Sequence, residues 1–286
     1  MPGAGDRGRR RWSLWALPLA FLPWLASVAA ADCLPPLGDG ALPQRARVAR
    51  VAADRSLVLD DGRLLRLADL DLPEGSEAGV ALETRLAAIV NRSIAFRPLG
   101  PAPDRWGRIL AQVVVGMDTV SDGGVADARG AARRWLEDAL VAAGLARVRP
   151  EGAAGSCARL LLAREDAARR AGLGLWQEAR YAVRSTADPA ALEALAGSFA
   201  LVEGVAASVG ERKDRTYVNF GQRWSVDTTV TISKRNWRRM RDNGISAARL
   251  KGRRVRVRGF VEADRGPLIE VSLPEEIEFI EADRSQ

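Results

Sequence analysis

Two short clusters of arginine and carboxylate side chains have the residue types needed for chemistry on a phosphate. The first, RLADLDLPE, begins at Arg66 and ends at Glu74, and the second, DRWGR, begins at Asp104 and ends at Arg108. Hydrolysis of a phosphodiester needs cations that neutralise the phosphoryl oxygens and a base that deprotonates water. Arg66 and Arg108 are candidates for the cations, Glu74 is the candidate base, and a hard metal cation held by neighbouring aspartates would clamp the phosphate. The same pattern is also typical of an ordinary solvated strand end.

The absence of histidine narrows the possible chemistry. None of the 286 residues is a histidine, which excludes Ser-His-Asp and Cys-His nucleophilic sites, histidine-ligated zinc or haem, and a histidine base. The two cysteines cannot build a four-thiolate zinc site or hold an iron–sulfur cluster alone. Catalysis would therefore use carboxylates, arginine, hydroxyl groups or a metal held by oxygen ligands.

The first 31 residues predict a signal peptide. Several arginines precede the apolar run from Trp12 to Leu25, and small residues follow up to Ala31, which is the order of a cleaved export signal. We expect an exported protein, periplasmic or secreted, without membrane contact after cleavage near Ala30 or Ala31. An uncleaved anchor is the alternative, although two prolines interrupt the apolar run.

Export makes a disulfide between the two cysteines plausible. In an oxidising compartment, Cys33 and Cys157 are candidates for one disulfide that ties the mature N-terminus to the body of the protein. The alternative is one buried thiol and one loose terminal thiol.

The remaining chain predicts two β-rich halves, an α+β fold that is mainly β. In the first half, alternation and turn signals predict strands at 45–51, 56–59, 63–70, 93–98 and 109–115. Helical spacing predicts helices at 80–90, 131–143 and 157–170. Five strands interrupted by one helix and followed by two others favour an oligonucleotide/oligosaccharide-binding (OB) type of five-stranded barrel carrying helices.

The second half repeats a strand-rich pattern. Residues 178–198 predict a helical connector that begins a helix at Asp188-Pro189. Strands are expected at 199–209, 216–220, 226–233, 253–262, 268–272 and 277–280, and a helix at 235–243. This pattern favours a second small OB-like barrel.

Basic and aromatic residues gather in the second half and indicate contact with nucleic acid. Arginine binds backbone phosphates, and aromatic rings stack on bases. The candidates for these contacts are Arg238, Arg239, Arg256 and Tyr217, together with Arg105 and Trp106 of the first half. The alternative is that the aromatic rings belong to the core and the charges form a solvated face.

Several blocks together resemble one family. They are RLADLDLPE (66–74), DRWGRILA (104–111), WLEDALVAAGLARV (135–148) and ARLLLAREDAARRAGLGLW (158–176), which follow a D-D-G hairpin. In order and spacing over roughly residues 43–177 they are similar to the staphylococcal-nuclease-like, or thermonuclease, family. The resemblance implies an OB-type barrel that hydrolyses DNA and RNA with calcium.

By position, the resemblance assigns a role to each candidate. Arg66 and Arg108 match the family's phosphate-binding arginines, Glu74 its general base, and Asp71 a calcium ligand, with the backbone carbonyl of Leu72 beside it. The expected division is a signal peptide at 1–31, a thermonuclease-like domain at 32–177, a connector at 178–198 and a second domain at 199–286. The expected partner is DNA or RNA, with no small-molecule cofactor, and the oligomeric state stays open.

One departure from the family pattern concerns the metal. The family has a calcium-ligating aspartate in a D-G-D-T turn, and here Arg55 stands at that ligand position. Either Asp54 or Asp69 substitutes as a ligand for calcium or another divalent cation, or Arg55 replaces the charge of the metal, or activity is lost. The chain is thus a metal-assisted nuclease, a catalytically weak nucleic-acid-binding protein, or an envelope protein whose barrels bind other proteins.

Overall fold

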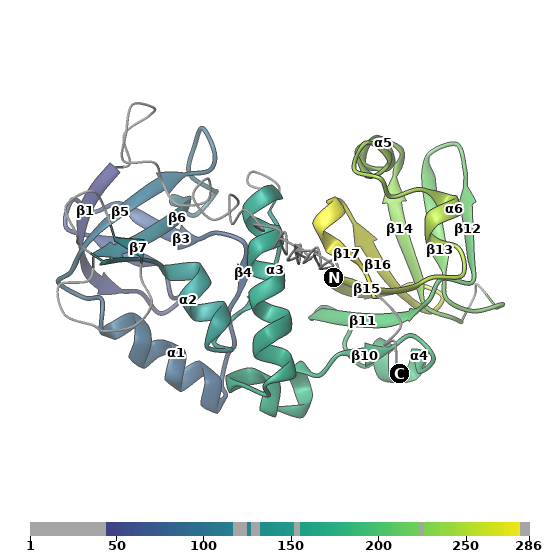
Figure 1. Cartoon of the computed structure of the whole chain (residues 1–286), viewed down its shortest axis with the longest axis horizontal. Helices are drawn as coiled ribbons and strands as arrows, with labels where there is room; N and C mark the ends of the chain where they lie inside the picture. The colour runs from purple at the N-terminus through teal and green to yellow at the C-terminus, as the bar shows by residue number, and fades with distance from the viewer. Residues whose placement is uncertain (1–43, 117–124, 127–131, 152–154, 224–225, 281–286) are drawn as a thin grey trace, which may run out of the picture.

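The computed structural model describes residues 44–116, 125–126, 132–151, 155–223 and 226–280. The predicted signal peptide and Cys33 lie outside these ranges. Two β-sheets lie side by side, and each encloses its own hydrophobic core (Figure 1). Among the described residues, no helix is long and apolar enough to cross a membrane.

Five strands of the first sheet close into a barrel. In chain order they are β1 (Gln44–Val51), β2 (Leu57–Leu59), β3 (Leu64–Leu67), β5 (Ser93–Pro98) and β6 (Arg108–Gly116). The order of neighbours is β3-β2-β1-β5-β6, and a parallel pairing of β3 with β6 joins the two ends. This closed barrel confirms the OB-type fold predicted for the first half.

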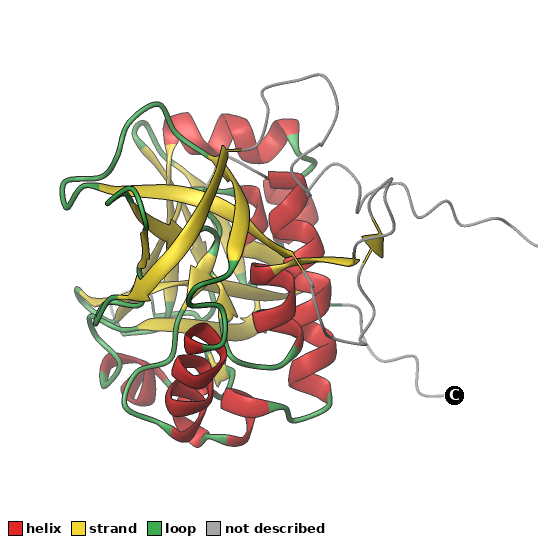
Figure 2. Cartoon of the chain, turned by 90° about the vertical axis from the view of Figure 1, so that its left-hand side faces the viewer, coloured by secondary structure: helices red, strands yellow, loops and turns green. Residues whose placement is uncertain are grey.

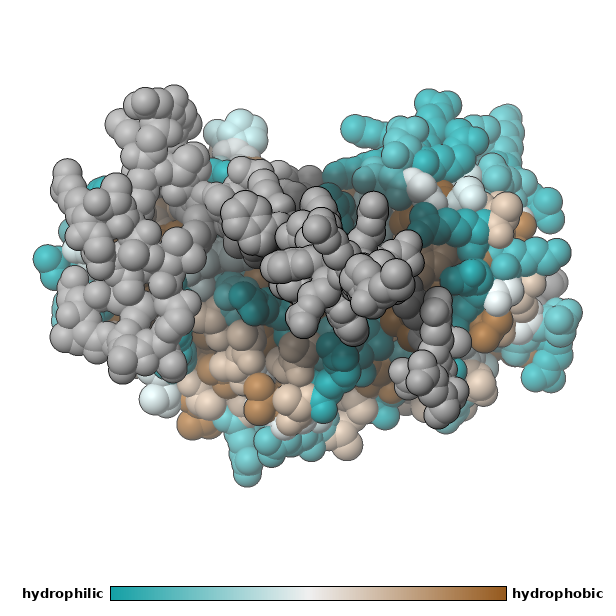
Figure 3. Space-filling view, in the orientation of Figure 1, coloured by the Kyte–Doolittle hydropathy of each residue, from teal (hydrophilic) through white to brown (hydrophobic). Residues whose placement is uncertain are grey.

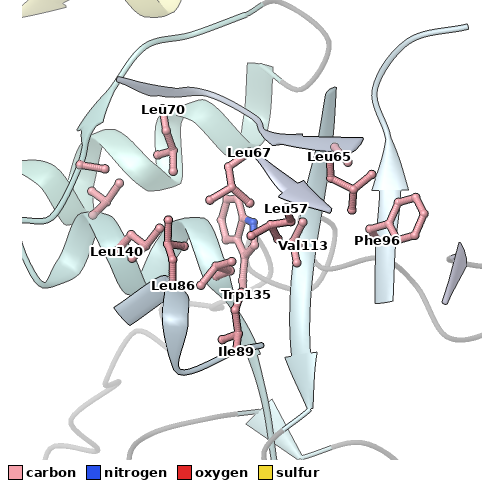
Figure 4. Close-up of a cluster of buried hydrophobic side chains, with 14 of the residues drawn as sticks. Leu57, Leu65, Leu67, Leu70, Leu86, Ile89, Phe96, Val113, Trp135 and Leu140 are labelled. Carbon is pink, nitrogen blue, oxygen red and sulfur yellow. The ribbon is translucent and has the colours of Figure 1, made fainter. Parts of the chain in front are cut away.

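The core of this barrel follows from the alternation of apolar residues along its strands. Leu57, Leu65, Leu67 and Val113 point inward and are buried, since every second residue of a strand faces the same side. Figure 4 shows Leu57, Leu67 and Val113 around the ring of Trp135, with helix residues beyond them. Burial of these side chains holds β3 and β6 in register.

Three helices pack against the first barrel, and the last of them stands between the two sheets (Figure 1); Figure 2 gives the view from the side of the first barrel. They are α1 (Glu77–Ala87), α2 (Leu136–Ala142) and α3 (Gly155–Arg170). The hydroxyl of Ser76 accepts a hydrogen bond from the Gly79 N–H and so caps the start of α1. Two short strands, β4 (Leu70–Asp71) and β9 (Arg147–Val148), pair with each other beside the barrel.

The predicted helix at 131–143 begins later than expected. Within it, β8 (Ala132–Trp135) extends the sheet from β6 and also pairs with β7 (Val125–Ala126). Trp135 lies opposite Val114 in the β8–β6 ladder and is buried, so packing of this large ring favours a strand over the first turn of a helix.

The second sheet repeats the pairing order of the first. Its main strands are β11 (Phe199–Val205), β12 (Ser208–Glu211), β13 (Arg215–Asn219), β14 (Thr229–Ser233), β15 (Arg254–Ala263), β16 (Pro267–Val271) and β17 (Ile277–Phe279). As in the first sheet, one pairing is parallel, here between β14 and β16.

This sheet curls back on itself through a bent strand. Only Ala206 and Ala207 separate β11 from β12, and their N–H groups donate to the carbonyls of Arg253, at 3.0 Å, and Asn219, at 2.8 Å. The two ladders therefore continue into each other, as predicted for a second OB-like barrel. Helices α5 (Lys234–Asp242) and α6 (Ala247–Leu250) follow β14, and Trp237 from α5 fills the core.

The connector is less helical than predicted. The 3-10 turn η1 (Gly174–Gln177) comes just before it, and residues 178–198 hold a second 3-10 turn, η2 (Ala179–Tyr181), the strand β10 (Arg184–Ser185) and the five-residue helix α4 (Pro189–Glu193). The side chain of Asp188 caps α4 by accepting from the Ala191 N–H, as the Asp-Pro pair indicated. β10 pairs with β11, so this part of the connector belongs to the second sheet.

Buried ion pairs join the two halves along α3. The guanidinium of Arg258 in β15 donates to the Glu165 carboxylate in α3 at 2.7 Å and to the Val148 carbonyl at 2.7 Å. Glu278 of β17 accepts a third hydrogen bond from the same guanidinium, at 2.5 Å. Glu165 in α3 and Val148 in β9 belong to the first half, whereas Arg258 belongs to the second. Arg258 therefore links the two cores.

Candidate functional site

The two candidate phosphate-binding arginines lie on one face of the first barrel. In the parallel β3–β6 ladder, Leu64 lies opposite Arg108 and Arg66 lies opposite Leu110. Residues two apart on a strand share a face, and register partners point to the same side. Arg66 and Arg108 therefore project from the same face, opposite to the buried Leu65.

A tight loop holds Arg108 in place. Asp104 accepts hydrogen bonds from the Arg108 Nε at 2.9 Å and from the Arg108 backbone N–H at 3.0 Å. Gly107 has a φ of 77°, which allows the chain to turn between these two residues. Burial acts to raise the pKa of Asp104, but the hydrogen bonds from Arg108 outweigh it and lower that pKa. The ring of Trp106, 59% exposed, lies 4.7 Å from the Arg108 guanidinium.

The turn between β1 and β2 connects Arg108 to the candidate base. Asp54 accepts a hydrogen bond from Arg108 Nη1 at 3.0 Å and two from Ser56, at 3.1 and 2.9 Å. Although burial acts in the opposite direction, these bonds lower the pKa of Asp54. The next residue, Arg55, lies 3.7 Å from a Glu74 carboxylate oxygen and donates to Glu83 of α1 at 3.1 Å.

Glu74 lies on a loop whose backbone is held by a buried proline and by a hydrogen bond from the connector. Its side chain is 85% exposed, so the carboxylate is accessible to water and substrate. Pro73 is buried, and Arg180 of η2 donates a hydrogen bond to the Glu74 carbonyl, which fixes the backbone on either side of the carboxylate. Arg180 therefore positions the candidate base from the connector.

Arg66 is paired with a residue for which the sequence pattern had suggested no role. Its Nη1 lies 2.8 Å from the Glu151 carboxylate. Glu151 also exchanges hydrogen bonds with Asp69: its backbone N–H donates to the Asp69 carboxylate at 2.8 Å, and its own carboxylate accepts from the Asp69 N–H at 3.2 Å. Burial, together with the nearby charge of Glu151, raises the pKa of Asp69 to about 6.

The geometry of Asp69 contradicts its predicted place beside Asp71. The prediction assumed a continuous strand, on which the two carboxylates would share a face. Asp69 instead has a φ of 57°, in a turn between β3 and β4, and its side chain is turned toward Glu151. A left-handed residue breaks the alternation of a strand, because its side chain no longer follows the pleat.

Asp71, the expected calcium ligand, is held by an arginine. Its Oδ2 accepts from both the Nε and the Nη2 of Arg147, at 2.9 and 2.7 Å. Arg147 is buried, with its guanidinium 5.0 Å from the Tyr181 ring and 5.1 Å from the Phe199 ring. Leu72 packs its side chain against the core, and the role of its carbonyl stays a prediction.

The calcium ion implied by the resemblance does not fit these residues. Each candidate carboxylate is engaged elsewhere: Asp54 with Arg108, Asp69 with Glu151, and Asp71 with Arg147. In the part of the chain that the structure describes, no three cysteine or carboxylate side chains come together in a way that could hold a metal ion. We therefore assign no step of the chemistry to a metal.

The comparison with known families identifies this half of the chain. Residues 65–178 match the family model described as staphylococcal nuclease homologue. The first barrel therefore carries a domain match to the staphylococcal nuclease homologue family, and we call it the nuclease-homologue barrel. The match includes Arg66, Glu74 and Arg108 but begins after the turn that carries Arg55, and it ends before the second barrel. No curated protein matches the chain.

The nuclease-homologue barrel and the second barrel both expose residues that the sequence predicted as nucleic-acid contacts. Arg105 stacks on Trp106, with its guanidinium 3.9 Å from the ring, beside Arg108. On the second barrel, α5 exposes Arg238 and Arg239, and Figure 3 shows a hydrophilic surface over this helix. Tyr217 is partly exposed on β13. Arg105, Trp106, Arg238, Arg239 and Tyr217 stay predictions as nucleic-acid contacts.

Arg256 requires a correction. The sequence placed it on an exposed basic strand, but it is buried and pairs with Glu203 at 3.1 Å, Asp166 of α3 at 3.7 Å and Glu278 at 3.9 Å. Because α3 of the nuclease-homologue barrel packs over this face of β15, Arg256 joins the two halves and is not available to a nucleic acid.

Three partners in the site were missed from the sequence. They are Glu83, Arg147 and Glu151, which pair with Arg55, Asp71 and Arg66 respectively. No motif pointed to them, since the residues of a pair lie far apart in the chain and meet only when the barrel closes.

Cys157 is disulfide-bonded in the structure. Cys33 lies outside the described residues, so the pairing of the two cysteines stays a prediction.

Proposed function

We propose that the nuclease-homologue barrel hydrolyses phosphodiester bonds of DNA or RNA at the face that carries Arg66 and Arg108. One observation carries the proposal: a single turn pairs with the candidate phosphate-binding residue Arg108 through Asp54 and with the candidate base Glu74 through Arg55. The neighbouring residues Asp54 and Arg55 therefore connect the candidate phosphate-binding residue to the candidate base through two ion pairs. The match to the staphylococcal nuclease homologue family supports nucleic acid as the substrate class.

The residues divide the reaction between them. Arg66 and Arg108 neutralise the non-bridging oxygens of the phosphate, whose negative charge increases as the water attacks. Glu74 takes one proton from that water. The water oxygen forms a new bond to phosphorus, the bond to the leaving sugar oxygen breaks, and that oxygen takes up a proton from solvent.

We also propose that the protein acts after export, in the periplasm or outside the cell. The order of charged, apolar and small residues at the N-terminus supports export. The disulfide at Cys157 supports an oxidising compartment, since disulfides do not persist in a reducing cytosol.

Cleavage of single- and double-stranded DNA and RNA by the purified protein tests the proposal. Glu74→Gln should lower the rate by about 10²–10⁴-fold, the usual contribution of a general base. It should leave the melting temperature unchanged, because an exposed ion pair contributes little to stability. Glu77→Gln, a change of an exposed carboxylate three residues away, is the matched control and should cleave like the wild type. Equal rates for the two variants would contradict the role of Glu74.

Binding without hydrolysis is the second candidate function. It is favoured by Arg55, which stands where the family pattern has a metal ligand, because a site without its metal still offers Arg66 and Arg108 to a phosphate. This function predicts salt-sensitive binding of DNA or RNA with no cleavage by either the wild type or Glu74→Gln.

A further inference from the structure

Arg55 occupies an unusual position for a charged surface residue. Its φ is 65°, in the left-handed region that bulky residues seldom adopt, and its side chain is only 11% exposed. The turn therefore directs the guanidinium inward, against the protein, and not into solvent.

The guanidinium lies between two carboxylates that come from different elements. Nη2 donates to Glu83 on α1 at 3.1 Å, and Nη1 lies 3.7 Å from Glu74 on the loop before α1. One positive charge thus faces two negative charges. The Nε of Arg55 is buried and has no hydrogen-bond partner among the described residues, so only Nη1 and Nη2 face the two carboxylates.

A second arginine neutralises the remaining acidic residue of the site. Both hydrogen bonds from Arg147 go to the same oxygen of Asp71, and Arg147 is enclosed by aromatic rings. A divalent cation at Asp71 would lie against this buried guanidinium, and like charges repel strongly where water is excluded. Each of the three carboxylates, Asp71, Glu74 and Glu83, therefore has an arginine partner within 4 Å.

We propose that Arg55 is a built-in cation of this site: its guanidinium takes the place of a divalent metal, so the protein neither binds nor requires calcium. This inference rests on the proposed function for its meaning in catalysis, since the positive charge of Arg55, 3.7 Å from Glu74, would act on the phosphate that this base serves. A guanidinium is suited to this task because it stays charged at every working pH and presents planar, directed donors to phosphate oxygens.

The test measures binding of calcium, magnesium or manganese to the full chain. Binding is measured by calorimetric titration and by the change in melting temperature on thermal unfolding. The wild type should show no saturable heat and no shift in melting temperature. Arg55→Asp should gain saturable calcium binding and a melting temperature that rises by several degrees with calcium, because it adds a third carboxylate to Glu74 and Glu83. Aspartate also tolerates the left-handed conformation of the turn. Arg55→Asn is the matched control, which removes the guanidinium without adding a carboxylate and should gain no binding.

Each outcome decides the inference. Saturable calcium binding by the wild type would overturn it, whether or not the variants fold. A folded Arg55→Asp that binds no more calcium than Arg55→Asn would also overturn it, because position 55 would then not be a cation position. Cleavage assays separate this inference from the proposed function. Wild-type cleavage should be unchanged in the presence of a chelator. The absence of all cleavage would contradict the proposed function, and the calcium titrations would then decide the role of Arg55.

Discussion

Removal of Arg258 should destabilise the protein more than any exposed arginine on the same strand. Its side chain is 0% exposed, and its guanidinium bonds the carboxylates of Glu165 and Glu278 and the carbonyl of Val148. Arg258→Met keeps an unbranched apolar chain in place of the aliphatic part of arginine but leaves Glu165 as a buried charge without its cation. Breaking a buried ion pair from one side typically costs about 3–5 kcal/mol. We expect a loss of this size in the free energy of unfolding.

The assay is chemical denaturation of the wild type and three variants, with the free energy of unfolding extrapolated to water. The matched control is Arg254→Met, which breaks the pair of Arg254 with Glu203, also at 2.7 Å, on the same strand. Arg254 is 60% exposed, so its loss should cost less than about 1 kcal/mol. Adding Glu165→Gln to Arg258→Met should recover part of the loss, because the amide removes the buried charge while its oxygen still accepts from the Val148 N–H. If Arg258→Met costs no more than Arg254→Met, the reasoning from burial is refuted.

Two further predictions concern the first barrel. Burial raises the pKa of Glu137 to about 8 from its usual 4.5, so the protonated carboxyl is favoured in the folded state, where it accepts from the Val113 N–H. The stability from this group is complete below pH 4.5 and is lost as the pH rises through 8, by up to about 1.4 kcal/mol per pH unit. Urea denaturation should show this decline in the wild type and a flatter profile in Glu137→Gln; identical profiles would contradict the prediction. In fluorescence anisotropy with single-stranded DNA, Trp106→Ala should weaken binding by about 5- to 150-fold, since stacking on one base contributes about 1–3 kcal/mol. Trp106→Phe should keep part of the affinity, and an Ala variant that binds like the wild type would remove Trp106 from the interface.

Local patterns in the sequence were enough to predict the elements that build both barrels. Leu57, Leu65 and Leu67 alternate with polar or partly exposed residues, and the structure buries all three. Side-chain caps at Ser76 and Asp188 mark the starts of two helices, and the second of these caps was predicted from the Asp-Pro pair. Such signals are readable because they act over a few neighbouring residues, where the period of apolar side chains and the capping chemistry decide the backbone.

The first strand of the second sheet and the connector show where local signals stop. The expected strand 199–209 is split at Ala206 and Ala207, whose N–H groups pair with two different strands. β10 forms because it pairs with β11, a contact that no periodicity within residues 178–198 could indicate. Strand pairing is a long-range contact, so its effect on a short segment is visible only in the folded chain.

The sequence by itself determined the chemistry that is possible in this protein: no histidine, two arginines and a glutamate at the spacing of the family motif, and an arginine in place of an expected metal ligand. Only the tertiary structure decided which charges face one another. Arg55 meets Glu83 across 28 positions of the chain, Arg147 meets Asp71 across 76, and Arg256 is buried under a helix of the other half. The physical reason is that an ion pair depends on distance and on the exclusion of water, and both arise from barrel closure and packing between the halves and not from the order of residues along the chain.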